Sequence, residues 1–424
     1  MFKKNALLFL MLMMSFFVVN EARAVPSFAR QTGMPCSSCH TVFPELTSFG
    51  RQFKLNGYTL TGMKQIESSK AENNLKINDT LPMSVMLQAG FTHVNKADPS
   101  VQNDDIQLPQ QLSLFLAGEI SSEVGSFIQL TYDQESDKLN WDNTDIRFAT
   151  QVDDNTFGVT LNNSPTVQDV WNSTPAWGYP FSGSGSAPGV SASGAGLLDM
   201  FAQDSAGIGG YAMWNGNIYT ELTLYRSAHL GQAQPDITSV NTINGVAPYW
   251  RLAWQNNLSN GDYLMLGTYG MKASVYPGDG ATTGISGPTD QYTDAALDAQ
   301  YEHMLASNLV SVHFNYQNEN QTLDATSAGN SPVVKTTKLD GTYHWGNEAT
   351  ATLAYWTTKA DSDYTAAYGG IGDNNGYIAQ ASYLPWQNTK LTAQYTAYSK
   401  FDGLPSGAKA ADNNTLFLQA WLMW

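Results

Sequence analysis

From about Leu81 to its end, the chain alternates apolar and polar residues in segments of roughly ten residues or slightly more. The clearest segment, 309–317, carries on one face Val310, Val312, Phe314 and Tyr316, and on the other Ser311, His313, Asn315 and Gln317. A period of two separates the side chains of a β-strand in this way. The pattern suits a strand between lipid and a wet lumen, although the strands of soluble sandwiches alternate too.

The connections between these segments are alternately short and long. Tight turns rich in Gly, Asn, Asp and Ser are expected at 121–123, 153–155, 215–217, 259–261, 306–308 and 346–348. Longer links lie near 95–106, 134–140, 166–205, 229–245, 278–289, 321–334, 360–373 and 403–413. This order predicts an all-β fold, a transmembrane antiparallel up-and-down β-barrel of about 16 strands, with short turns on the periplasmic side.

The end of the chain and its aromatic residues fit a barrel in an outer membrane. The stretch 415–424 resembles the aromatic-terminated last strand by which outer-membrane proteins are recognised for assembly, although a buried strand of a soluble protein could also end so. Aromatic residues near strand ends are expected at the lipid headgroups, with ordinary core packing as the alternative. They are Trp141, Tyr179, Tyr211, Trp214, Tyr219, Tyr249, Trp250, Tyr276, Trp345 and Trp386. The long link 166–207 is expected either to constrict the pore or to lie outside it.

The N-terminal segment and the net charge narrow the class of protein further. Residues 1–24 combine Lys3 and Lys4, an apolar run and an Ala-Arg-Ala site, which predicts a cleaved signal peptide, with an uncleaved anchor as the alternative. No later stretch approaches the roughly 20 apolar residues that a membrane helix needs, so a helical membrane protein is excluded. The net charge of −16 makes nucleic acid an unexpected partner.

The only two cysteines of the chain form a motif with the following histidine, Cys36-Ser37-Ser38-Cys39-His40. C-x-x-C-H is the signature of covalent c-type haem attachment, in which the thiols bond the haem vinyl groups and the imidazole binds the iron. A structural disulfide, a thioredoxin-like redox pair and a zinc site are the other interpretations. The motif therefore predicts one covalently bound haem c, with Cys36 and Cys39 as anchors and His40 as proximal ligand.

The chain divides into three parts on these grounds. They are the signal peptide at 1–24, a monohaem cytochrome c segment at 25–78, and an outer-membrane porin-like β-barrel at 79–424. The middle part is too short for an ordinary independent core, while a barrel of about 16 strands can enclose an aqueous lumen. We therefore expect the haem-bearing segment to be a plug inside the barrel.

The sequence around the motif carries a resemblance to a known family. Residues 25–36, then Cys39-His40, the Phe-Pro-Glu-Leu at 43–46 and the Phe-Gly-Arg-Gln-Phe-Lys-Leu-Asn-Gly-Tyr at 49–58 resemble the head of the fused monohaem cytochrome-porins. That family contains the outer-membrane cytochromes implicated in ferrous iron oxidation. Along the barrel the resemblance is architectural only.

The resemblance implies an outer-membrane, metal-binding electron-transfer protein of a Gram-negative bacterium, an oxidoreductase in which all redox chemistry resides at the haem. Extracellular ferrous iron, or another reduced donor, would give one electron, which would reach a periplasmic c-type cytochrome. Arg51 and Lys54 are expected either to pair with the haem propionates or to be solvated lumen charges. Whether barrels associate into homo-oligomers stays open.

The second axial ligand is not fixed by the sequence. Met63 is the preferred candidate because it lies in the same short segment; Met83, Met86 and His93 are alternatives, and an open sixth position is another. A thioether would raise the reduction potential relative to two imidazoles. Acidic loop residues are expected either to attract a ferrous cation or to serve solubility. They are Asp104, Asp105, Asp361, Asp363 and Asp373.

Three further functions compete with inward electron transfer. The same architecture could work outward, it could be a diffusion porin with a haem-bearing plug, or it could be a soluble periplasmic haem protein with a β domain. The chain contains no G-x-S-x-G, H-E-x-x-H or Walker motif. Enzymatic activity other than at the haem is therefore not expected.

Overall fold

The computed structural model describes residues 26–60, 81–96, 102–133, 137–185, 187, 196–228, 242–259, 261–276, 287–386, 388–405 and 407–424. Sixteen long strands form the wall of a barrel. They are β3 (Met83–Val94), β4 (Asp105–Ser121), β5 (Val124–Asp133), β6 (Lys138–Val152), β7 (Asn155–Asn162), β8 (Ser205–Trp214), β9 (Ile218–Ser227), β11 (Ala247–Asn257), β12 (Tyr263–Tyr276), β13 (Asp290–Leu305), β14 (Asn308–Leu323), β15 (Val333–Trp345), β16 (Ala349–Ala360), β17 (Asn374–Tyr383), β18 (Thr389–Phe401) and β20 (Thr415–Met423).

Each strand pairs antiparallel with its neighbours along the chain, and the barrel closes between the last strand and the first. In the closing ladder, which runs along β20 and β3, Thr415 faces Val94 and Met423 faces Met86. Two short strands, β10 (Thr242–Ile243) and β19 (Leu404–Pro405), extend the sheet beside the long links. The predicted fold class and strand number are confirmed. The signal peptide at 1–24 lies outside the described residues.

The outer wall of the barrel is apolar and the inner wall is polar. Leu353, Ile106 and Ile120 point outward with 73%, 72% and 61% of their surface exposed. On β14 the predicted inner face is buried, with Ser311 at 0% and His313 at 3% exposure. Exposed aliphatic side chains in such number are stable against lipid rather than water. The chain is an outer-membrane barrel that crosses the bilayer with its strands.

The aromatic residues divide between the two faces. Outward-facing residues with 40% to 57% exposure are Trp141, Trp214, Trp250, Trp345 and Trp386. The prediction of a headgroup position was wrong for Tyr179, Tyr211, Tyr219 and Tyr249, which are 0% to 4% exposed and lie inside the barrel. Tyr179 lies in the link after β7 rather than in a strand. For the other three the cause is strand parity: Tyr211, for example, points inward because it lies three positions from the outward-facing Trp214 on β8. Proximity to a strand end therefore does not show whether a side chain points toward the lipid or toward the lumen.

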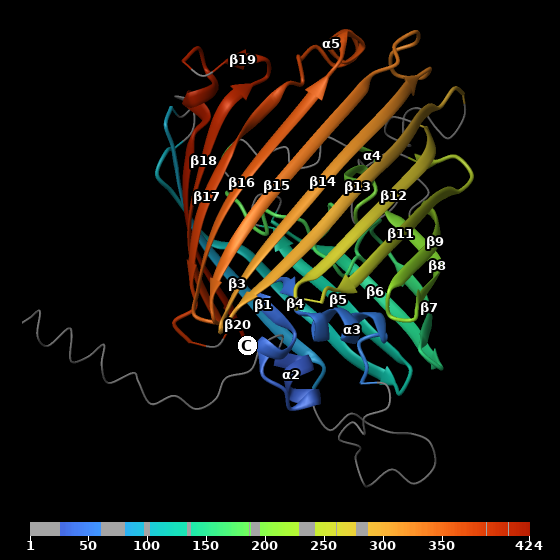
Figure 1. Cartoon of the computed structure of the whole chain (residues 1–424). Helices are drawn as coiled ribbons and strands as arrows, with labels where there is room; N and C mark the ends of the chain where they lie inside the picture. Colours follow the sequence, from blue (N-terminus) through green and yellow to red (C-terminus); the bar gives the residue numbers. More distant parts are fainter. Residues whose placement is uncertain are drawn as a thin grey trace, which may run out of the picture.

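Residues 26–60, called the plug from here on, occupy the short-turn end of the barrel (Figure 1). The plug contains α2 (Pro26–Thr32), the 3₁₀ turn η1 (Cys36–Ser38), the strand pair β1 (His40–Val42) and β2 (Glu45–Leu46), and α3 (Ser48–Leu55). Figure 1 shows these elements at the same end as the chain's C-terminus. No helix among the described residues is long and apolar enough to cross a membrane.

Hydrogen bonds attach the plug to strands on several sides of the wall. The Gln31 side chain bonds the backbone of β4, donating to Ala117 O at 3.0 Å and accepting from Glu119 N at 3.0 Å. The Tyr58 hydroxyl donates to Asp145 on β6 at 2.7 Å. Further contacts join Tyr211 Oη to Leu55 O, Lys390 Nζ to Phe43 O, and Arg51 to Glu302. The plug is therefore held by the lumen-facing side chains of the barrel.

The long link after β7 folds into the lumen, which was one of its two predicted positions. Residues 163–185 of this link contact several strands, for example where Ser173 Oγ donates to Asp298 and Ser182 Oγ donates to Gln419. Arg251 on β11 joins the link to the wall, because its guanidinium lies 3.3 Å from Asp169 and 2.7 Å from Asp298. Residues 163–185 are called the inner loop from here on, and they contact the plug, where Asn172 Oδ1 accepts from Leu46 N. The same link carries α4 (Gly196–Met200) farther along the chain, and two other long links carry α5 (Ser362–Tyr368) and η2 (Ala410–Asn413).

Candidate haem site

The two cysteines lie at either end of one tight turn. Cys36 begins η1, and the backbone N–H of Cys39 donates to the carbonyl of Cys36 at 3.0 Å. Neither cysteine forms a disulfide, the Cys36 thiol donates to Asn388 Oδ1 at 3.9 Å, and both residues are partly exposed. His40 follows directly and begins β1. A single turn thus presents the two thiols and the imidazole from adjacent positions, as the motif predicts.

Helix α3 supports this turn from behind. Thr47 caps the helix by accepting from Gly50 N at 3.1 Å, and its hydroxyl also donates to Ser38 O at 2.6 Å. The N–H of Thr47 donates to Cys39 O at 3.0 Å. Gly50 comes so close that a Cβ at this position would lie 2.1 Å from Cys39 O. The glycine in the Phe-Gly-Arg stretch is therefore required by close packing of α3 on the cysteine turn.

His40 is held in an orientation suited to ligation. Its Nδ1 faces the carbonyl of Glu45 at 3.3 Å, which makes Nδ1 the protonated nitrogen and leaves Nε2 as the nitrogen for a metal. Phe43 packs against the ring with centroids 5.2 Å apart. Burial lowers the pKa of His40 to about 4. The imidazole is thus neutral at neutral pH, which is the form that binds iron.

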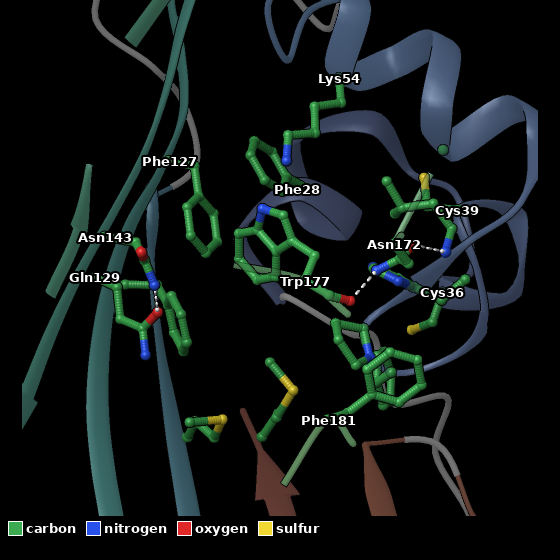
Figure 2. Close-up of a pocket in the computed structure, with 18 of the residues that line it drawn as sticks. Phe28, Cys36, Cys39, Lys54, Phe127, Gln129, Asn143, Asn172, Trp177 and Phe181 are labelled. Carbon is green, nitrogen blue, oxygen red and sulfur yellow. Dashed lines mark hydrogen bonds between the residues drawn. The ribbon is translucent and has the colours of Figure 1, made fainter. Parts of the chain in front are cut away.

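A cavity of about 360 Å³ opens beside the motif and lies between the plug, the inner loop and strands β3 to β6 and β20. Cys36, Cys39 and His40 all line it. Its apolar lining includes Phe28, Phe43, Phe49, Phe53, Phe115, Phe127, Trp177, Phe181 and Trp421. Figure 2 shows the cysteines on one side of this space, with Phe127, Gln129 and Asn143 of the barrel wall on the other. The volume is within the range of roughly 300–1,000 Å³ that is usual for small-molecule sites.

The residues present fit a haem better than they fit the other interpretations of the motif. Burial, and then the nearby Cys36, raise the pKa of the Cys39 thiol to about 11, whereas redox-active dithiols have lowered pKa values. Within the described ranges, no group of three or more His, Cys, Asp and Glu side chains is placed to hold one metal ion, as zinc would require. The aromatic lining suits a flat apolar macrocycle instead.

Arg51 and Lys54 have protein partners in this structure. The guanidinium of Arg51 pairs with Glu302 on β13 and also donates to Leu46 O at 3.0 Å, and Arg51 does not line the cavity. Lys54 does line it, but its Nζ donates to the carbonyls of Val167 and Asp169 at 2.7 Å each. Their pairing with haem propionates stays a prediction that this geometry does not support. Both residues instead join the plug to its surroundings.

The described candidates for the second axial ligand differ in whether they line the cavity. Met63, the preferred one, lies outside the described residues. Met86 is 3% exposed and lines the cavity, whereas Met83, on the same strand, does not. His93 lies seven residues beyond Met86 on β3, roughly 23 Å away at the strand's rise. His93 is paired with Asp104 at 2.8 Å and has no access to the cavity.

Sequence reasoning missed most of the residues that line the cavity, among them Trp177, Asn172 and Met423. Trp177 and Asn172 come from the inner loop, and Asn172 Oδ1 accepts from Leu46 N of the plug at 3.1 Å. Met423, next to the last residue of the chain, also lines the cavity. A tryptophan within a link rich in Gly, Ser and Pro was the one available signal, since such a link rarely needs a large aromatic residue in water.

The acidic loop residues are mostly committed to local structure. Asp361 caps α5 and accepts from Val333 N at 3.0 Å, and Asp363 accepts from Ser331 N at 3.1 Å. Asp373 pairs with Lys400 at 3.3 Å, and Asp104 pairs with His93. These partners favour a structural role over attraction of a cation.

Comparisons with known proteins bear on the barrel only. No family model matches the chain, and no curated protein matches it. Among solved structures, the chain is similar to OmpF of Salmonella typhi in a complex with daunomycin, with 13% identity over 81% of this chain and 97% of that one and a TM-score of 0.51. It also matches the outer-membrane channel DcaP of Acinetobacter baumannii, with 12% identity over 81% and 96% and a TM-score of 0.48. The likeness to OmpF shows the barrel fold alone.

Proposed function

We propose that this chain is an outer-membrane cytochrome-porin that carries electrons from extracellular ferrous iron, or another reduced donor, to a periplasmic c-type cytochrome. The observation that supports the proposal most is the convergence of Cys36, Cys39 and His40 on one aromatic-lined cavity within the barrel. Their spacing is the one that covalent haem attachment requires. A haem bound there would supply one-electron redox chemistry.

The chain's own residues would hold this group and control its surroundings. Cys36 and Cys39 would form the two thioether bonds, and His40 Nε2 would ligate the iron. The carbonyl of Glu45 at His40 Nδ1 fixes the tautomer and makes the imidazole a stronger donor. Phe127 of the wall and Trp177, which lies between Phe127 and the cysteine turn in Figure 2, would give the haem apolar surroundings.

The overall reaction involves electrons only. Ferrous iron outside the cell loses one electron and becomes ferric, and an oxidised carrier in the periplasm gains that electron. No covalent bond forms or breaks. Because the insoluble ferric product stays outside, the barrel need not admit iron. The position of the plug at the short-turn, periplasmic end supports delivery of the electron to a soluble carrier there.

Stopped-flow absorbance tests the proposal. The oxidised protein, purified in detergent, is mixed with ferrous iron without oxygen, and the reduced c-type band is followed. We expect the band to grow in the wild type and to be absent in a His40→Ala variant that still forms a barrel. If dithionite reduces the protein but ferrous iron does not, the iron assignment is wrong and outward flow or another donor gains support.

A diffusion porin is the competing function, because the fold is that of porins. Against free diffusion, the inner loop bonds to strands on nearly opposite sides of the wall, because Gln168 O accepts from Arg147 on β6 and Ser173 O accepts from Asn315 on β14. Planar-bilayer conductance separates the two functions. A closed or barely conducting wild type is expected; a large, steady conductance would favour the porin.

A further inference from the structure

We infer that Met86, on the barrel wall, supplies the second axial ligand to the haem. This inference rests on the proposed function, because it assumes a haem attached to Cys36 and Cys39. In this arrangement the two iron ligands do not both come from the plug. The site would be assembled from two parts of the chain, with one ligand from the plug and the other from the first strand of the barrel.

Met86 lies where a side chain of the barrel wall can reach the haem cavity. Met86 lies on β3 with its side chain turned inward, is 3% exposed, and lines the cavity together with His40. The thioether is a soft ligand that suits haem iron. Three described methionines line this cavity, namely Met34, Met86 and Met423.

Met34 and Met423 are less suited than Met86 to be the second ligand of the haem iron. Met34 lies two residues before Cys36, in the plug, and so belongs to the same short segment as the anchors and His40. A second ligand must approach the opposite face of the macrocycle, which favours a residue of the facing wall. Met423 faces Met86 across the β20–β3 ladder, and its backbone N–H donates to Asn388 O at 3.0 Å. Met423 therefore makes a close matched control.

A neighbouring amide orients the sulfur of Met86. Gln88 Nε2 lies 3.6 Å from Met86 Sδ and donates to it, while Gln88 Oε1 accepts from Gln419 Nε2 at 2.9 Å. Gln419 thus fixes the direction of the Gln88 amide. Because a thioether sulfur has two lone pairs, the bond from Gln88 leaves one for a metal. No corresponding bond to the sulfur of Met423 is found among the described residues.

The location has a consequence for the barrel. Met86, Met423 and Trp421 lie on the two strands that close the barrel, and they pack in one buried cluster with Phe115 and Ala117. Ligation by Met86 would therefore link the haem to the closing seam. It would also raise the reduction potential above that of a protein with two imidazole ligands, which suits an acceptor of electrons from iron.

Spectroscopy of the purified holoprotein tests the inference without relying on activity. The ferric wild type should show the weak near-infrared band of thioether-to-iron charge transfer, and the ferrous form should show strongly upfield-shifted methionine methyl signals by NMR. Met86→Leu should abolish both and shift the reduction potential, while Met423→Leu should keep both. Met86→His, which keeps a ligand at this position, should replace the thioether band by a spectrum of two imidazoles and lower the potential.

The outcomes separate this inference from the proposed function. A wild type that carries covalent haem but lacks both thioether signals would overturn the inference and leave the proposed function in place. Signals that persist in Met86→Leu, or disappear only in Met423→Leu, would overturn it too. If the wild type carries no covalent haem by the pyridine haemochrome spectrum, both the inference and the proposed function are wrong.

Discussion

The barrel wall and the plug are built on different principles. The wall has sixteen strands joined by backbone hydrogen bonds in a closed ladder, so that no single side chain decides its formation. The plug, by contrast, contains two helices shorter than ten residues and a two-stranded ribbon. Such short elements are marginal alone. The plug therefore depends on particular contacts with the wall, and substitutions that damage it should leave the barrel intact.

The largest expected effect comes from the motif itself. Cys36→Ser with Cys39→Ser should remove covalent haem completely because both anchors are lost, and His40→Ala should remove the proximal ligand of the iron. Barrel formation should be unchanged, since these side chains make no contact in the ladder. Haem staining of denaturing gels measures the covalently bound haem, and heat-modifiable gel migration measures barrel formation. Ser37→Ala, at the exposed middle of the turn, is the control and should keep the haem.

Loss of Arg51 should release the plug from the wall. Arg51→Met leaves the Glu302 carboxylate, which is 13% exposed, without its guanidinium, and breaking a buried pair in this way costs about 3 kcal/mol. Limited proteolysis should then cut the plug much faster while the strands stay protected. Arg51→Met combined with Glu302→Gln should recover part of the protection. Equal cleavage rates in the wild type and Arg51→Met would show that this ion pair does not hold the plug.

A smaller effect is expected at the contact between α3 and the cysteine turn. Gly50→Ala places a methyl group 2.1 Å from Cys39 O, so the helix must move away, at a cost of roughly 1–3 kcal/mol. The fraction of chains that carry haem should fall, as measured by the ratio of haem to protein absorbance. Gly183→Ala, where the added carbon meets no atom within 4 Å, is the matched control. An unchanged haem content in Gly50→Ala would contradict the close packing.

The smallest expected effect is a pH dependence of plug docking. Burial, and then Arg147, lower the pKa of Lys54 to about 7 from its usual value near 10.5. Between these two values the Lys54 side chain of the released plug binds more protons than that of the docked plug, so the contribution of Lys54 to docking should strengthen as pH rises from 7 and should be constant below 7. Proteolytic protection of the plug measures this. Lys54→Met should make the rise in protection between pH 7 and 10.5 shallower than in the wild type, and an unchanged slope in this variant would disprove the contribution of Lys54.

The features that were predictable from the sequence are those that a local pattern determines, both in the wall and in the plug. Strand number, turn positions and the inward faces of β14 were predictable because alternation repeats and lipid demands an apolar exterior. The anchors and proximal ligand were predictable because covalent chemistry fixes the spacing of Cys36, Cys39 and His40. In both cases a local rule determines the position.

The remaining features depend on contacts between distant residues. Glu302 pairs with Arg51 across 251 positions, and Met86 and Met423 meet only when the barrel closes. No local pattern marks these residues. For the same reason the pairing of Arg51 with Glu302 was not among the two roles predicted for it, haem-propionate pairing and a solvated lumen charge, because its carboxylate partner on β13 was not recognisable from the plug sequence.

Reconstitution in lipid vesicles tests the proposed electron conduit most directly. Oxidised soluble cytochrome c is trapped inside vesicles that carry the purified protein, and ferrous iron is added outside without oxygen. We expect reduction of the trapped cytochrome with the wild type and none with a His40→Ala barrel. Reduction at the same rate with His40→Ala would mean that iron enters through the pore, and no reduction with the haem-loaded wild type would contradict the conduit.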